Sequence, residues 1–285
     1  MGGLKPTALV TGASSGIGRE TVIRLAKRGY RVIGVARRMD RVAELSSHFE
    51  GVIPKKADLS RPDEVEALCK YILERSQPVT ALVNNAGYSI RGALENVPLH
   101  GIKRLFEVNL FSLIRITQAC LAGMRKQRFG TIVNLSSIAG KFAFPMSGVY
   151  AATKHAVEAI SDALRAEVRP FGIRVVIIRP GAIATEFNEV ANRMTSNLIQ
   201  HTAKDYEPVQ QSLGAAMGRI FSELTLPGPG LIADLIEQAV LSQAPKAVYT
   251  AGPLVEEFLK PRFEMDDETY DKYMLQKTGL ARLRL

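Results

Sequence analysis

A serine, a tyrosine and a lysine are the residues whose spacing most clearly suggests chemistry. Tyr150 and Lys154 are four positions apart in the helical pattern GVYAATKHAVEAI, so both side chains fall on one helix face. Ser137 directly follows an apolar run, residues 131–136, typical of a strand. An ammonium favours the phenolate and lowers the usual tyrosine pKa near 10, while a serine hydroxyl stabilises charge developing on a substrate oxygen. The set predicts the proton transfer that accompanies hydride transfer to a carbonyl or from an alcohol.

The same tyrosine–lysine spacing recurs at Tyr273 and Lys277, in a different context. The residue corresponding to Ser137 would be Lys260, and no strand pattern lies near it. In open α/β sheets, ligands gather at the carboxyl ends of strands, where only the first set would sit. We therefore expect Tyr273 to be an ordinary half-buried aromatic residue.

A glycine-rich turn, TGASSGIG at 11–18, follows an apolar run and opens a helical pattern. Such a turn lets backbone N–H groups and a helix N-terminus approach a pyrophosphate; the alternative is a tight turn without a ligand. After the second strand pattern come Arg37 and Arg38, where an NAD site commonly has Asp or Glu. An arginine fork matches a 2′-phosphate, so NADP (NADPH) is favoured, the alternative being a solvated basic turn.

The first two-thirds of the chain alternates short β-branched runs with longer helical patterns. Strands are expected at 7–10, 32–36, 51–54, 81–84, 131–136 and 174–178, with a weaker one at 248–250. Helices are expected at stretches including 18–28, 63–74, 103–126, 149–168 and 231–242. This alternation predicts an α/β fold, a doubly wound, mostly parallel seven-stranded sheet with helices on both faces.

Composition sets the broad class. The 285 residues are 46% apolar and 23% charged, as in an ordinary soluble globular protein. The formal net charge of +9 admits nucleic acid, anionic lipid or a phosphate-bearing ligand as partners and alone decides nothing. We expect one domain over 1–285, with a substrate-lid insertion at about 186–226 and a C-terminal extension at about 252–285. Cys69 and Cys120 are too few for a disulfide framework, so a reducing cytoplasmic compartment is expected. No transmembrane run or basic tract is evident, which argues against a membrane span and a nucleic-acid partner.

Taken together, the motifs resemble the common branch of the short-chain dehydrogenase/reductase family over residues 5–250. They are TGASSGIG at 11–18, NNAG at 84–87, Ser137, YAATK at 150–154, and RPG at 179–181 followed by Thr185. The resemblance implies a Rossmann-type fold of the NADP-preferring type. It assigns Tyr150 as acid/base, Lys154 as the group that lowers its pKa and holds the nicotinamide ribose, and Ser137 as the group that polarises the carbonyl. Asn109 completes a proton relay through a water at a helix kink.

The resemblance also implies a set of cofactor-binding residues and no metal. Three positions have plain alternatives: Asn109 could merely cap or kink a helix, Asp58 could be a strand-end turn residue, and Asn84 is expected to bridge strands. The expected cofactor-binding residues are Gly12, Ser14, Ser15, Gly16, Ile17, Gly18, Arg37, Arg38, Asp58, Leu59, Asn85, Ala86, Gly87, Tyr150, Lys154, Pro180, Gly181, Ile183 and Thr185.

The substrate side is expected to be apolar, which favours a steroid-, retinoid- or fatty-chain-like carbonyl or alcohol. The alternative is that these side chains pack the lid on the core or form a dimer contact. The expected lid residues are Val190, Met194, Leu198, Ile199, Val209, Leu213, Met217, Ile220 and Phe221, with Phe142, Phe144 and Met146 opposite.

The C-terminal extension has three alternative placements: over the active site, against a partner subunit, or at a membrane surface. The family resemblance implies a homodimer or homotetramer.

The sequence therefore predicts an NADP-dependent oxidoreductase that interconverts a carbonyl and an alcohol of a small-molecule substrate. The alternative is an NADP-binding redox-sensing regulator without turnover. Regulators of that kind often lack the tyrosine or the lysine, whereas Ser137, Tyr150, Lys154 and Asn109 are all present.

Overall fold

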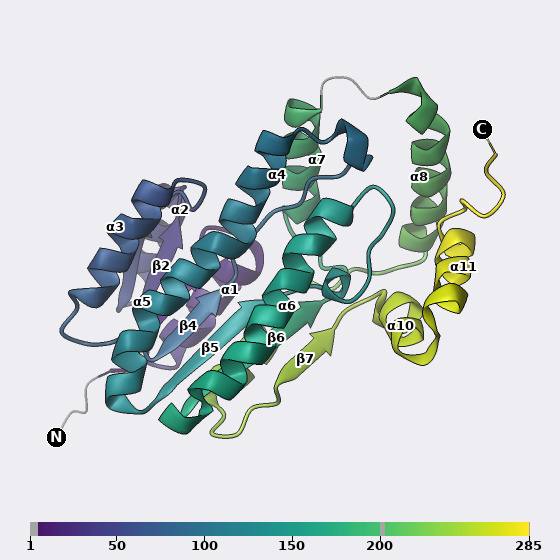
Figure 1. Cartoon of the computed structure of the whole chain (residues 1–285). Helices are drawn as coiled ribbons and strands as arrows, with labels where there is room; N and C mark the ends of the chain where they lie inside the picture. The colour runs from purple at the N-terminus through teal and green to yellow at the C-terminus, as the bar shows by residue number, and fades with distance from the viewer. Residues whose placement is uncertain (1–4, 200–202, 285) are drawn as a thin grey trace.

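The computed structural model describes residues 5–199 and 203–284 and is built on one parallel sheet of seven strands (Figure 1). The strand order is β3-β2-β1-β4-β5-β6-β7, so the order reverses between β1 and β4. The doubly wound fold expected from the alternating pattern is confirmed. The strands are β1 (Thr7–Thr11), β2 (Arg31–Ala36), β3 (Val52–Lys56), β4 (Ala81–Asn84), β5 (Gly130–Leu135), β6 (Ile173–Pro180) and β7 (Val248–Ala251).

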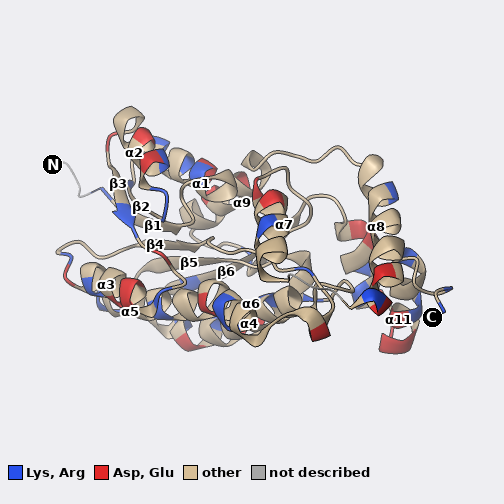
Figure 2. Cartoon of the chain, turned by 90° about the horizontal axis from the view of Figure 1, so that it is seen from above, with Lys and Arg blue, Asp and Glu red and all other residues tan. Residues whose placement is uncertain are grey.

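Alternate side chains of the strands face two separate hydrophobic cores. Ala8 and Val10 belong to one core and Leu9, between them, to the other; all three are fully buried. Helices α1 (Gly16–Lys27), α2 (Met39–His48) and α9 (Gly230–Leu241) cover the first face, while α3 (Pro62–Leu73), α5 (Ser112–Gln127) and α6 (Gly148–Val168) cover the second (Figure 2). Burial on both faces explains why the strands are almost continuously apolar.

Helix α4 (Leu99–Phe106) runs through a π-helical turn, Glu107–Phe111, into α5. The combined helix, Leu99–Gln127, is long and apolar enough to cross a membrane by length and composition alone. Half of its most apolar window is buried inside the protein. The kink that we expected near Asn109 is the π-helical turn Glu107–Phe111.

The chain after β6 builds a separate wall beyond the carboxyl ends of the strands (Figure 1). It contains α7 (Phe187–Leu198), α8 (Glu207–Ser222) and, after β7, a π-turn (Val255–Leu259), α10 (Lys260–Glu264) and α11 (Asp267–Lys277). The C-terminal helices pack in an aromatic cluster with Phe142 and Phe144 from the loop after β5 and with Phe221 of α8. Of the three placements considered for the extension, the structure shows packing beside the candidate site.

Candidate active site

The glycine-rich turn joins β1 to α1 in a conformation that glycine favours. Gly12 and Gly16 have φ of +67° and +52°, and a Cβ on Gly18 would overlap the Gly12 carbonyl oxygen. Ser15, the N-cap of α1, makes no side-chain capping bond, and the first turn of α1 contains no acidic residue. The N-terminus of α1 is therefore open to an anionic group, as a dinucleotide pyrophosphate requires.

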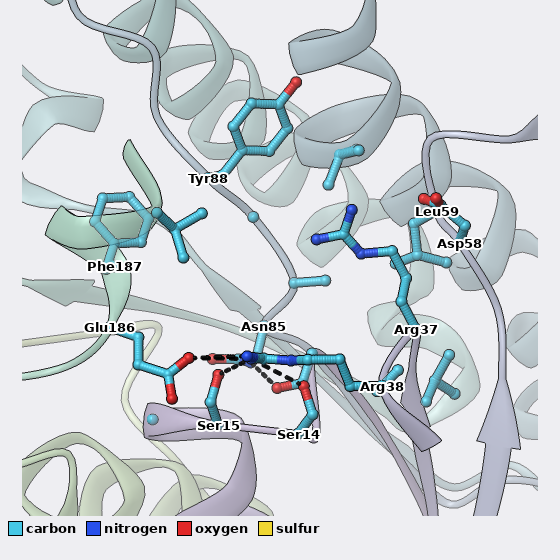
Figure 3. Close-up of a pocket in the computed structure, with 18 of the residues that line it drawn as sticks. Ser14, Ser15, Arg37, Arg38, Asp58, Leu59, Asn85, Tyr88, Glu186 and Phe187 are labelled. Atoms are coloured by element: carbon cyan, nitrogen blue, oxygen red, sulfur yellow. Dashed lines mark hydrogen bonds and ion pairs between the residues drawn. The ribbon is translucent and has the colours of Figure 1, made fainter. Parts of the chain in front are cut away.

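A pocket at the reversal point of the sheet contains most of the expected cofactor-binding residues (Figure 3). This is the crevice in which open α/β sheets bind nucleotides. The expected residues that line it are Gly12, Ser14, Ser15, Gly16, Ile17, Arg37, Arg38, Asp58, Leu59, Asn85, Ala86, Gly87 and Thr185. The bare glycine turn and the surrounding arginines fit a phosphorylated dinucleotide.

Asp58 lies at the end of β3 with its carboxylate partly committed to its own turn. Its Oδ1 accepts hydrogen bonds from the Ser60 N–H (3.0 Å) and hydroxyl (2.8 Å). Burial raises the pKa of Asp58, but the Ser60 bonds and the charges of Arg37 and Arg104 outweigh burial and lower it. Asp58 thus combines the two interpretations weighed above, since it shapes a strand-end turn and also lines the pocket.

Arg38 extends across the pocket toward Ser15 and Glu186 (Figure 3). Its guanidinium donates to the Ser15 hydroxyl at 3.1 Å and to the Glu186 carboxylate at 3.1 Å, and it reaches Ser14 at 3.5 Å. Arg41 also pairs with Glu186, at 2.6 Å. Arg37 makes no side-chain hydrogen bond or ion pair to any residue in the described ranges and is the more available of the two arginines for a ligand phosphate.

A second cavity, of about 720 Å³, contains Ser137, Tyr150 and Lys154. Ser137 follows β5, and the other two residues lie on the first turns of α6. Pro180, the last residue of β6, and Gly181 and Ile183, from the loop after it, also line this cavity. The two pockets adjoin, because five residues line both of them: Ile17, Asn85, Gly87, Thr185 and Phe187.

Burial dominates the electrostatics of Tyr150 and Lys154. It raises the pKa of Tyr150 to about 12, against smaller lowering effects of the Ser137 hydroxyl and the Arg91 guanidinium. It lowers the pKa of Lys154 to about 8, partly offset by Glu158. The Lys154 ammonium donates to the Leu135 carbonyl at 2.7 Å and lies 5.8 Å from the Tyr150 ring centroid. The expected lowering of the Tyr150 pKa by Lys154 is thus not seen, because desolvation is the larger effect.

Asn109 is buried in the π-turn and lines neither pocket. Its Nδ2 donates to the Tyr88 carbonyl (2.9 Å) and to the Thr153 hydroxyl (3.1 Å), and its Oδ1 accepts from the Tyr88 N–H (3.1 Å). Thr153 in turn donates to the carbonyl of Tyr150. Asn109 therefore ties the segment after β4 to α6, and its role in a proton relay stays a prediction.

Several residues singled out in the sequence lie outside both pockets. Gly18 lines neither pocket, because it packs against the glycine-rich turn itself. Asn84 donates to Asn134 and Thr117, which confirms that it bridges neighbouring elements. Tyr273 is half-buried and donates to a backbone carbonyl, as expected. Within residues 5–199 and 203–284, no group of three or more His, Cys, Asp or Glu is placed to hold a metal.

The structure also adds pocket residues that sequence reasoning did not identify. Tyr88, Arg104, Glu186 and Phe187 line the dinucleotide pocket, and Arg91 lines the second cavity. Arg91 and Arg104 lie outside the motifs, and only the packing of distant segments brings them to the pockets. Tyr88, directly after the NNAG motif at 84–87, and Glu186 and Phe187, directly after Thr185, could have been suspected from their positions.

The walls of the second cavity are mostly apolar, but only part of the expected set forms them. Leu213, Met217 and Phe221 of α8 face Phe144 and Met146. The expectations for other residues were wrong. Phe142 is buried in the aromatic cluster, and Ile220 is partly buried there. Val190 and Met194 line the dinucleotide pocket instead of the second cavity. Leu198 and Ile199 pack in the cluster around Tyr88, because Gly92 and Gly101 leave room for them there.

Fold and site together define a dinucleotide-dependent enzyme architecture, and comparisons identify its class. The short chain dehydrogenase family model matches residues 6–196, so the chain belongs to the short-chain dehydrogenase/reductase family of oxidoreductases. A probable short-chain type dehydrogenase/reductase, VdlC of Helicobacter pylori, is 36% identical over 184 residues, 65% of this chain and 67% of that protein. The NADPH-dependent 3-dehydrocapnine reductase of Ornithobacterium rhinotracheale is 31% identical over 274 residues, 93% and 94% of the two chains.

Two solved structures show the same fold over nearly the whole chain. A short-chain dehydrogenase from Streptomyces avermitilis superimposes with a TM-score of 0.80 at 28% identity, covering 97% of this chain and 98% of that one. A short-chain dehydrogenase from Sphingobium yanoikuyae, solved in complex with NADPH, gives a TM-score of 0.72 at 26% identity, with 98% and 96% covered.

Proposed function

We propose that this oxidoreductase uses NADPH to interconvert a carbonyl and an alcohol on an apolar substrate, with Tyr150 as the acid/base. The observation that carries the proposal is the position of Tyr150 and Ser137 in an apolar cavity that shares walls with the dinucleotide pocket. A substrate oxygen in that cavity would lie beside the bound nicotinamide, whose reduced form supplies the hydride.

The side chains would then divide the work on the substrate oxygen. Ser137 donates a hydrogen bond to the carbonyl and stabilises the charge that develops there. Tyr150 gives its proton to the resulting alkoxide. With its pKa raised to about 12, the phenol is protonated at neutral pH, which is the form that carbonyl reduction needs. Lys154, still largely charged below its pKa of about 8, would hold the nicotinamide ribose and stabilise the phenolate left after proton transfer.

Preference for NADP over NAD is supported by the charge of the dinucleotide pocket. Arg37, Arg38 and Arg104 line it, and β2 ends in alanine with no carboxylate to accept a ribose 2′-hydroxyl. The 3-dehydrocapnine reductase is named as NADPH-dependent, and the Sphingobium neighbour was solved with NADPH, which favours the same choice.

The test compares Tyr150→Phe with Tyr273→Phe, a matched control because Tyr273 has the same spacing to a lysine outside the site. Turnover of bulky apolar ketones with NADPH should fall by about 10²–10⁴-fold in Tyr150→Phe and stay near wild type in Tyr273→Phe. Both variants should bind NADPH in a fluorescence titration. A wild-type protein that binds NADPH tightly yet reduces no ketone or aldehyde would support the redox-sensing alternative instead.

A further inference from the structure

Arg91 is a solvent-exposed cation that lines the substrate cavity and has no role in the proposed chemistry. The charged residues that line the cavity are Arg91 and Lys154, and its described lining contains no Asp or Glu. Lys154 is committed to the Leu135 carbonyl. The remaining polar side chains are hydroxyls and amides, among them Asn188, Asn192 and Gln210. The positive charge of Arg91 is therefore uncompensated within this part of the chain.

The backbone around Arg91 is held from two sides. Its N–H donates to the Thr195 hydroxyl of α7 at 2.9 Å, and the N–H of Gly92 donates to the Met146 carbonyl at 2.7 Å. Its guanidinium donates to Asn188 Oδ1 at 2.6 Å. The first two contacts hold the backbone of this segment, and the bond to Asn188 orients the solvent-exposed guanidinium at the cavity wall. Pre-organised donors of this kind bind anions with little ordering cost.

Arg91 and Tyr150 line the same cavity. Partial burial lowers the pKa of Arg91, although the residue as a whole is exposed to solvent. No described carboxylate forms an ion pair with it, whereas Arg38, in the dinucleotide pocket, pairs with Glu186. An anionic ligand group would restore that missing partner.

We propose that Arg91, oriented by Asn188, is a subsite for an oxyanion group of the substrate, so that the preferred substrates are amphiphilic oxoacids with an apolar chain rather than neutral ketones. The anionic group is a carboxylate, sulfonate or phosphate near the reacting carbonyl. The chain extends along Phe144, Met217 and Phe221. This inference rests on the proposed carbonyl chemistry and adds the substrate class to it.

The experiment compares two probes of the same shape, 4-oxodecanoate and 4-oxodecanamide, with NADPH. A charge-assisted hydrogen bond should give the oxoacid a kcat/KM about tenfold or more above that of the amide, carried mainly by KM. In Arg91→Gln this preference should disappear while amide turnover is retained. Arg193→Gln, which removes an exposed arginine of α7 outside both pockets, should keep the preference. Added salt should narrow the wild-type difference.

Two outcomes would overturn the subsite. One is equal turnover of both probes by the wild-type protein, a result that needs no variant. The other is an Arg91→Gln protein that loses turnover of the oxoacid and the amide to the same extent, which would assign Arg91 to the reacting oxygen or to structure. Failure of the proposed function looks different, because then neither probe nor any other carbonyl would be reduced.

Discussion

Glu158 is the residue whose replacement should reveal how the active-site helix is anchored. It lies one turn beyond Lys154 on α6, with its side chain 2% exposed, and it pairs with Arg179 at the end of β6. Two hydrogen bonds from Arg179, at 2.8 and 2.6 Å, join the carboxylate, and Lys141 lies 3.4 Å away. The pair therefore ties the helix that carries Tyr150 to the strand that leads into the loop after Pro180.

Glu158→Gln keeps the shape of the side chain but leaves the nearly buried Arg179 without its counter-ion. Breaking a buried pair in this way costs about 3–5 kcal/mol. Because Lys141 is 28% exposed and the glutamine can still accept one hydrogen bond, we expect a loss near the lower end, about 3 kcal/mol. For a protein of this size, that corresponds to a fall in Tm of roughly 6 °C or more.

The assay is thermal and urea unfolding of four proteins: wild type, Glu158→Gln, Arg179→Met and the double variant. Removing both charges avoids the uncompensated arginine, so the double variant should be clearly more stable than the sum of the single effects implies. Glu167→Gln, at an exposed site on the same helix, is the matched control and should change stability by about 0.5 kcal/mol or less. If the losses of unfolding free energy in the two single variants simply add in the double variant, the reasoning is refuted.

Three further outcomes follow from the site geometry. Because the pKa of Lys154 is lowered to about 8, kcat/KM for reduction should fall as the pH rises through about 8 and the ammonium loses its proton; a flat profile to pH 10 would contradict this. Gly18→Ala, whose Cβ would overlap the Gly12 carbonyl, should abolish NADPH binding in a fluorescence titration, whereas Gly148→Ala, with open space around it, should bind normally. Arg37→Gln should raise the KM for NADPH about tenfold and leave that for NADH unchanged, since one charge-assisted phosphate contact is lost; equal effects on both cofactors would count against 2′-phosphate binding.

The sheet was predictable because the strands are buried on both faces and read as apolar runs. The run at 81–84 matches β4 at both ends. The expected bounds of β1, β2 and β5 differ from the observed ones by one residue, and larger differences occur in the edge strand β3 and in β6, next to the edge strand β7. β3 extends to Lys56 because its backbone pairs with β2 up to Ala36, and polar side chains are tolerated on an edge strand. β6 extends to Pro180 because β7 pairs with Arg179 and Pro180, which the weak pattern at 248–250 did not indicate.

The site was predictable where its residues are close in sequence and was not where they are distant. The glycine turn and the Tyr150–Lys154 pair are local patterns whose spacing follows from one turn or one helix. Arg91, Arg104 and Glu186 come from three different segments, and only the packing of those segments places their charges in the pockets. No spacing rule connects them.

The electrostatics of Tyr150 show why residue types alone give an incomplete account of reactivity. A lysine four positions away suggests a lowered pKa for Tyr150. Both side chains are desolvated, however, and desolvation disfavours the charged form of each one. The phenol therefore stays protonated and the Lys154 ammonium becomes a stronger acid than usual, so Tyr150 is in the form that gives a proton rather than takes one. Alcohol oxidation requires the opposite state of Tyr150, which an added positive charge near the phenol would favour. On this reasoning, the positive nicotinamide ring of the oxidised cofactor is itself what would turn the same tyrosine into a base.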